Sequence, residues 1–368
     1  MKPSFFSIAT NFDDDLLGYI AKLGILEIYG GLTNTAGGTG RPNGSLPYIN
    51  YEKAASHIKT ARKHGLSFNL LLNSACWGNI EFTSEGRKRI KELIDFACQI
   101  GVEKITTANP VICNWIKSHS SYIKVKVSVH GEADSISRID WWLKNGADIV
   151  TLPTRCNRNF RFLKHIQSIF SEHLEILLNN LCLPNCPLDR YHGQTISHDY
   201  SVPMYFPDIC LIQCNLYKLK YPHILLSSNW VRPEDVELYE EIGFKYFKLA
   251  DRCKSTSWLM RVAKAYVTRQ SPENLISILN FPIPCEEDER ISINDVTGWK
   301  MPTIKIANNL LNGFLKPFID EICFGDCLYE GCSHCKYYAD RALIYDKAEF
   351  EKAIQTLEKM YSDFLDFN

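Results

Sequence analysis

Residues 232–251, RPEDVELYEEIGFKYFKLAD, form one complete helix-then-strand unit. The first half, RPEDVELYEEIG, carries a proline in its first turn and ends at a glycine, a pattern that is typical of a helix. The second half contains YFKLAD (246–251), a short run rich in apolar and aromatic residues that is typical of a strand. Repeated units of this kind predict a parallel sheet covered by helices, so the number of units decides the fold.

Seven further strands are predicted before this unit, with helical patterns between them. Eight repeats over about 270 residues predict an α/β fold, a TIM-like (β/α)8 barrel, with a doubly wound open sheet as the alternative. No G-x-G-x-x-G motif follows the first strand, which argues against a dinucleotide-binding sheet. The seven strands are FFSIAT (5–10), ILEIYG (25–30), SFNLLLN (67–73), KITTAN (104–109), KVKVSV (124–129), DIVTLP (148–153) and LEILLNN (174–180).

The repeat ends near residue 270, which suggests two regions. We predict a barrel over residues 1–270 with a cysteine-bearing loop at 181–215. We predict a C-terminal, cysteine-rich extension over 271–368, which includes loops or connecting strands at 282–300. The amphipathic pattern of YDKAEFEKAIQTLEKMYSDFLDF (345–367) predicts a final helix that docks on the body.

Composition and charge exclude some classes of protein. The chain has 368 residues, with 41 basic and 42 acidic residues and a formal net charge of -1. The chain therefore lacks the overall positive charge that is typical of nucleic-acid-binding proteins, although a local basic groove is possible. The N-terminus lacks the apolar segment of a signal peptide, and no apolar run is long enough to span a membrane. We therefore expect a cytoplasmic protein.

Fourteen cysteines are unusual in such a chain. Disulfides are disfavoured in a reducing cytoplasm, so clustered cysteines indicate metal or redox chemistry. Isolated cysteines are usually small buried hydrophobic residues. Eight of the fourteen fall into two groups: Cys182, Cys186, Cys210 and Cys214, and then Cys323, Cys327, Cys332 and Cys335.

The first group lies where a barrel carries its active site. The loops that follow the strands of a parallel barrel form the active face, and Cys182 and Cys186 come directly after the seventh predicted strand. Cys210 and Cys214 precede the eighth strand, and Cys253 directly follows it. Four thiolates can hold a [4Fe–4S] cluster or a structural zinc ion. The Cys-x₃-Cys spacing is looser than a zinc knuckle and favours the cluster, with unligated thiols as a further alternative.

The second group, CFGDCLYEGCSHC (323–335), is the stronger metal motif. Its four cysteines are separated by three, four and two residues, and Gly325 and Gly331 permit tight turns around a metal. The motif predicts a second [4Fe–4S] cluster or a zinc site.

Candidate catalytic and substrate-binding residues also follow the predicted strands. His192 and His198 lie behind the first cysteine pair and can transfer protons near neutral pH, although a structural role in the loop is the alternative. Arg252 ends the eighth strand, where catalytic groups of barrels lie. Arginines in these loops can bind an anionic substrate. The substrate-binding candidates are Arg41, Asn73, Arg190 and Tyr191.

Four stretches resemble the collagenase-like peptidase family U32. They are LLNSACWGN (71–79), NNLCLPNCPLDRYH (179–192), NWVRPEDVELYEEIGFKYFKLADRCKST (229–256) and RVAKAY (261–266), and the resemblance covers roughly residues 1 to 280. It implies a TIM-like barrel with a [4Fe–4S] cluster on four cysteines, and relatives that include oxygen-independent hydroxylases of ubiquinone precursors or RNA bases. The implied ligands are Cys182, Cys186 and Cys214, with Cys210 and Cys253 competing for the fourth place. The family has a Lys-x-x-Gly-Arg motif, which corresponds to residues 248–252 here, and Asp251 replaces its glycine.

Three functions are consistent with these features. The main hypothesis is an iron–sulfur redox enzyme that modifies a small molecule, a peptide or an RNA base and receives electrons from a ferredoxin or a flavoprotein. The alternative is a collagenase-like peptidase with Cys76 as its nucleophile, although the chain has no His-Glu-x-x-His or Gly-x-Ser-x-Gly motif. A non-catalytic subunit with a zinc-bound tail that docks on another protein is the third.

Overall fold

The computed structural model describes residues 4–33, 35, 38–41, 46–198, 209–281 and 301–366. Eight parallel strands close into a barrel in sequence order, so the predicted TIM-like barrel is confirmed and the open sheet is wrong. Each strand lies within the range that the sequence predicts. The strands are β1 (Phe5–Ala9), β2 (Glu27–Gly30), β3 (Ser67–Leu72), β4 (Lys104–Thr107), β5 (Lys124–Val127), β6 (Ile149–Leu152), β7 (Leu174–Leu177) and β8 (Tyr246–Leu249).

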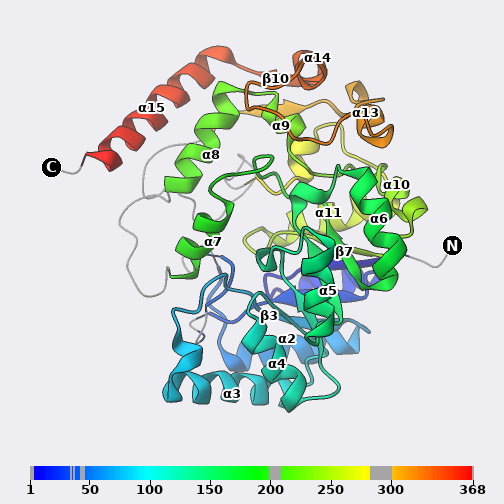
Figure 1. Ribbon diagram of the computed structural model, residues 1–368, viewed down its shortest axis with the longest axis vertical. Helices are drawn as coiled ribbons and strands as arrows, with labels where there is room; N and C mark the ends of the chain where they lie inside the picture. Colours follow the sequence, from blue (N-terminus) through cyan, green and yellow to red (C-terminus); the bar gives the residue numbers. More distant parts are fainter. Residues whose placement is uncertain are drawn as a thin grey trace.

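Helices surround the barrel (Figure 1). Side chains of Asn50, Thr83, Asn109, Ser135 and Ser255 each accept a hydrogen bond from a backbone N–H in the first turn of a helix. These caps fix where five of the helices begin. The surrounding helices are α1 (Asp15–Lys22), α2 (Tyr51–Lys63), α3 (Ser84–Gln99), α4 (Pro110–His119), α5 (Ile136–Lys144), α6 (Phe160–Phe170), α10 (Val236–Ile242) and α11 (Thr256–Thr268).

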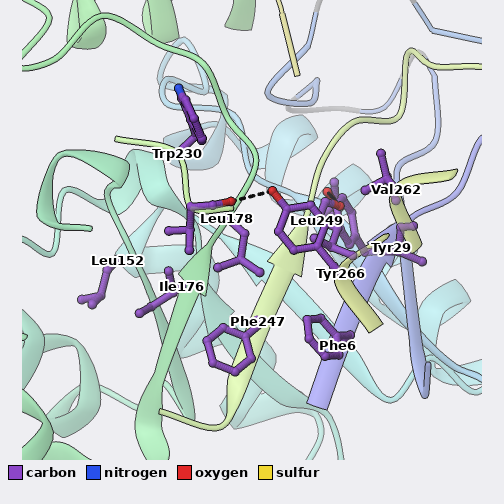
Figure 2. Packing of buried hydrophobic residues seen from close by; sticks show 14 of the residues in the cluster. Phe6, Tyr29, Leu152, Ile176, Leu178, Trp230, Phe247, Leu249, Val262 and Tyr266 are labelled. Atoms are coloured by element: carbon purple, nitrogen blue, oxygen red, sulfur yellow. Dashed lines mark hydrogen bonds between the residues drawn. The ribbon is translucent and has the colours of Figure 1, made fainter. Parts of the chain in front are cut away.

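The main hydrophobic core lies between the strands and these helices. Phe6, Ile176, Phe247 and Leu249 are buried there, and Figure 2 shows them side by side on neighbouring strands. The rings of Phe6 and Phe247 are 5.6 Å apart. Burial of such side chains on the outer face of the barrel provides most of the apolar stabilisation of the fold.

The inside of the barrel is polar instead. The ammonium of Lys126 is completely buried, 2.7 Å from a carboxylate oxygen of Glu27 and 2.6 Å from one of Glu175. Lys104 donates to the second oxygen of Glu27. Burial raises the pKa of Glu27, but Lys126 and Lys104 more than offset it and lower that pKa to about 2. The interior charges therefore form a compensated network.

The chain between β7 and β8 and the C-terminal extension lie together beyond one side of the barrel (Figure 1). The former contains α7 (Asp189–Ser197), α8 (Ile209–Lys220) and α9 (Ile224–Ser227). The extension contains β9 (Ile304–Ile306), α13 (Lys316–Ile319), α14 (Ser333–Ala342), β10 (Leu343–Tyr345) and α15 (Lys347–Leu365). Helix α15 confirms the predicted final helix, and it packs along α8. The loops predicted at 282–300 lie outside the described residues.

In the part of the chain that the structure describes, every helix is too short or too polar to cross a bilayer.

Candidate functional site at the barrel mouth

An ion pair closes over the carboxyl-terminal end of the barrel. Arg41, from the loop after β2, places Nε 3.1 Å from both carboxylate oxygens of Asp251, which follows β8. Asp251 is buried, whereas the side chain of Arg41 is partly exposed. Burial raises the pKa of Asp251, but Arg41 and Arg252 outweigh burial and lower it. The sequence predicted Arg41 and Arg252 here, and the structure places both at the mouth.

Further basic groups give the mouth an excess of positive charge. Lys248 lies near the end of β8, and its ammonium is 4.2 Å from the centre of the Tyr29 ring. Burial lowers the pKa of Lys248 to about 8 and also lowers the pKa of Arg252. The charge of Lys248 is partly offset by Glu175 inside the barrel. At the mouth itself, among the described residues, Asp251 is set against Arg41 and Arg252, an arrangement that suits an anionic ligand.

His130 is a mouth residue that our sequence interpretation missed. It follows β5, the position where side chains of a barrel strand reach the active face, and this position was the signal that could have revealed it. Burial, and then the charges of Arg41 and His192, lower the pKa of His130 to about 4. A Cβ atom at Gly40 would lie 3.1 Å from its Nε2. The imidazole is therefore neutral at pH 7 and can both donate and accept a hydrogen bond.

Helix α7 covers this histidine. A Cβ atom at Gly193 would lie 3.1 Å from Nδ1 of His130, so a glycine allows the helix to approach. Ser197, on the last turn of α7, accepts a hydrogen bond of 3.0 Å from the backbone N–H of Ala75. Asp189, on the first turn, pairs with Arg155 at 3.2 Å. Both ends of α7 are thus attached to loops of the barrel face.

The predicted residues on α7 and at its C-terminal end separate into two groups. His192 contributes to the electrostatic environment of His130, and His198 lies beside Gly78 in the loop after β3. Arg190 and Tyr191 are exposed to solvent instead. Asn73 is buried beside the mouth, where it accepts a hydrogen bond of 3.2 Å from the backbone N–H of Gly40. Substrate binding by these residues remains a prediction.

Three thiols of the first cysteine group come together next to the mouth. Cys182 and Cys186, after β7, interact electrostatically with each other and with Cys214 on α8. Burial raises the pKa of Cys182 to about 11 and that of Cys186 to about 12. Cys210 is buried one turn before Cys214 on the same helix. Arg41 interacts with Cys182 and with Cys253, which links these thiols to the mouth.

Lys218 is a buried cation beside these thiols. It lies one turn after Cys214, on the same face of α8. Its Nζ donates to the carbonyl of Leu181 at 2.9 Å and lies 4.8 Å from the centre of the Phe281 ring. Its charge lowers the pKa of Cys182 against the larger effect of burial. The side chain is completely buried, a placement that is costly for a charge without an anion nearby.

The second cysteine group also comes together. Cys332 caps the N-terminus of α14, and its thiol interacts with the backbone N–H groups of His334 and Cys335 and with the thiols of Cys327 and Cys335. Cys323 interacts electrostatically with Cys327 and Cys335. Burial raises the pKa of Cys332, but these hydrogen bonds more than offset it and lower that pKa.

The two cysteine groups are neighbours. The side chain of Asn185, between Cys182 and Cys186, donates to the carbonyl oxygen of Gly325 at 3.3 Å. Tyr329, in the C-terminal motif, packs on Tyr217 of α8 with ring centres 4.9 Å apart. It also interacts electrostatically with Cys186 and Cys214. The sequence interpretation placed the groups in separate regions and did not predict this proximity.

No cysteine that the structure describes forms a disulfide, and Cys285 lies outside the described residues. Among the described residues, no group of three or more His, Cys, Asp or Glu side chains is arranged to hold a metal ion.

The chain was compared with known proteins. It is 28% identical over 323 residues to the uncharacterized protease MJ1657 of Methanocaldococcus jannaschii, which covers 86% of this chain and 88% of that protein. The solved structure of the U32 peptidase Mk0906 superposes with a TM-score of 0.50 at 18% identity, over 67% of this chain and 93% of that one. The predicted resemblance to the U32 peptidases is confirmed. No family model matches the chain.

The relationship to the U32 peptidases leaves the chemistry open, because one relative is uncharacterized and the similarity to the other shows the fold alone. Their names support the predicted alternative, a peptidase, better than the iron–sulfur hypothesis.

Proposed function

We propose that the chain is an iron–sulfur redox enzyme that acts on an anionic substrate at the barrel mouth. The observation that carries this proposal is the convergence of Cys182, Cys186 and Cys214 beside the buried ammonium of Lys218. Thiolates, or a cluster bound to them, would supply an anion for Lys218, which forms no ion pair with a carboxylate among the described residues.

The chemistry of the donors fits an iron–sulfur cluster, because Cys182, Cys186 and Cys214 interact with one another and thiolates are the ligands of such clusters. In a [4Fe–4S] cluster each thiolate binds a different iron, so the sulfur atoms stand farther apart than four ligands of one ion do. Cys182, Cys186 and Cys214 would hold the cluster, with Cys210 or Cys253 as the fourth ligand. A bound cluster would supply one-electron chemistry, with electrons from a ferredoxin or flavoprotein.

The surrounding side chains would handle the substrate. Arg41 and Arg252 would bind its anionic group, and Asp251 would hold Arg41 in place. His130 is neutral and could donate or accept a proton or a hydrogen bond, with His192 next to it. Helix α7, which covers His130, would limit access of water to this group.

Metal analysis tests the proposal. The protein is purified without oxygen and reconstituted, and iron and acid-labile sulfide are measured for the wild type, Cys182→Ser and Cys98→Ser. Cys98 lies on α3 and serves as the matched control. We expect about four irons per chain from the barrel site, with matching sulfide, in the wild type and the control and their loss in Cys182→Ser. An iron-free wild type would refute the proposal.

A peptidase remains the second candidate, because Cys76 and His198 flank the same glycine. The backbone N–H of Gly78 donates to the thiol of Cys76 at 3.5 Å, and a Cβ atom at Gly78 would lie 3.2 Å from the ring of His198. A Cys–His pair is the machinery of a thiol peptidase. If this candidate is correct, peptide cleavage persists in a metal chelator and is lost in Cys76→Ala.

A further inference from the structure

A second buried cation lies under the C-terminal cysteine motif. Arg158 precedes α6 and is 1% exposed. Its Nη atoms donate to the backbone carbonyls of Leu226 and Trp230. Its guanidinium carbon lies 5.5, 5.0 and 5.5 Å from the ring centres of Trp230, Phe314 and Phe318. Its Nε has no hydrogen-bond partner among the described residues.

The carboxylate that interacts with Arg158, that of Asp235, already forms an ion pair with another arginine. Asp235 interacts with Arg158 electrostatically, but its two oxygens accept hydrogen bonds of 2.6 and 2.8 Å from Arg232. Cys335 and Cys323 also interact with the guanidinium, and Cys335 does so more strongly than Asp235. A guanidinium stays protonated in proteins, so the fully buried charge of Arg158 requires an anion. Within the part of the chain that the structure describes, the cysteines are the groups in place to provide it.

The local backbone is shaped around these thiols. Gly325 and Gly331 adopt φ values of 74° and 73°, which turn the chain sharply between successive cysteines. A Cβ atom at Gly331 would lie 2.2 Å from Nε2 of His223, and the same nitrogen is 2.9 Å from the carbonyl oxygen of Tyr329. The motif is therefore seated closely against the segment that leads into α9.

We propose that Cys323, Cys327, Cys332 and Cys335 hold a metal centre with four thiolate ligands, and that Arg158 neutralises part of its negative charge. A zinc ion and a [4Fe–4S] cluster would interact with Arg158 in the same way, because either centre carries a net negative charge when four thiolates bind it. The centre would attach the C-terminal extension to the barrel, because its four ligands belong to the extension whereas Arg158 lies just before α6 of the barrel. The inference does not depend on the reaction proposed for the barrel mouth.

Thiol alkylation mapped by mass spectrometry tests this site in the wild-type protein. Cys327 is exposed, so an unligated thiol there would react readily with iodoacetamide. We expect alkylation of Cys327 to be at least about tenfold slower in the metal-loaded protein than after removal of the metal by a chelator. Equal rates in the two samples would overturn the proposal.

Metal analysis of variants supplies the second readout. Cys323→Ser with Cys332→Ser should remove zinc, or about four irons with their sulfide, while Cys182→Ser leaves that metal in place. Arg158→Met should lower retention of the same metal during dialysis, and Arg161→Met, an exposed arginine on α6, should not. Unchanged metal in the double cysteine variant would overturn the proposal. Loss of metal only in Cys182→Ser would support the barrel cluster alone, so the two proposals fail separately.

Discussion

Lys126 and Lys218 are both completely buried, yet their surroundings differ. Inside the barrel, Lys126 lies within 2.7 Å of carboxylate oxygens from Glu27 and Glu175. On α8, Lys218 has a backbone carbonyl at 2.9 Å, an aromatic ring, and the thiol of Cys182 nearby. The barrel interior thus compensates its own charge, whereas the region next to the mouth has a cation in place for an anion that cysteines can provide.

This contrast distinguishes a structural network from a binding site. A buried ion pair that is complete within the chain needs no ligand, and breaking it leaves an uncompensated charge. A buried cation beside thiols is costly until those thiols ionise on a metal, so the cost is relieved by metal binding. The following predictions test that difference, from the largest expected effect to the smallest.

Replacing Lys126 should have the largest effect. Lys126→Met leaves Glu175 without its ammonium partner and Glu27 with Lys104 alone, which should lower the free energy of unfolding by about 3 to 5 kcal/mol at pH 7. Urea unfolding measures the change, and Lys124→Met, an exposed position on the same strand, is the control. A loss no larger than that of the control would show that the interior network is not a compensated unit.

Lys248 should give a pH-dependent effect of about 3 kcal/mol. Its pKa is about 8 in the folded chain and ordinarily 10.5, so the unfolded chain binds the proton more tightly. The penalty is complete below about pH 8 and disappears as the pH rises toward 10.5. Wild type should therefore gain about 3 kcal/mol relative to Lys248→Met across that interval. Parallel stability curves for the two proteins would contradict the burial of a charged Lys248.

Replacing Lys218 should change the free energy of unfolding in the opposite direction to replacing Lys126. In metal-free protein, Lys218→Met removes a buried charge that pairs with no carboxylate of the described residues, and it should raise the free energy of unfolding by about 1 to 2 kcal/mol. The same variant should hold iron less well, because the cluster loses a neighbouring cation. Unfolding and iron retention are measured beside Lys220→Met, an exposed position on α8. Destabilisation of the metal-free variant would place Lys218 with Lys126 as a structural residue.

The smallest expected change in stability concerns helix α7, which covers His130 at the barrel mouth. Arg155 pairs with Asp189 of α7 at 3.2 Å and also with Glu132 and Asp134. These pairs are partly exposed, so Arg155→Met should change the free energy of unfolding by about 1 kcal/mol or less. Cleavage of α7 by a protease should nevertheless become faster than in Arg161→Met. Equal cleavage rates would mean that this ion pair does not hold α7.

Much of the fold could be predicted from the sequence, because eight buried parallel strands leave eight short apolar runs. The position of Arg41, Asn73 and Arg252 at the mouth followed from strand ends. His130 was missed although the same rule applies to it, and the polar barrel interior was not anticipated. The proximity of Asn185 to Gly325 depends on how the extension packs against α8, which no local pattern encodes. For the same reason the sequence did not single out Lys218 and Arg158.

Electron paramagnetic resonance of the anaerobically prepared, dithionite-reduced protein tests the central claim most directly. The account predicts the signal of a reduced [4Fe–4S] cluster in the wild type, loss of the barrel cluster's signal in Cys182→Ser, and a weakened one in Lys218→Met. It predicts no change in Lys220→Met. A wild type without any iron–sulfur signal after reconstitution would contradict the account, and Lys218 would then be a buried lysine with no bound anion.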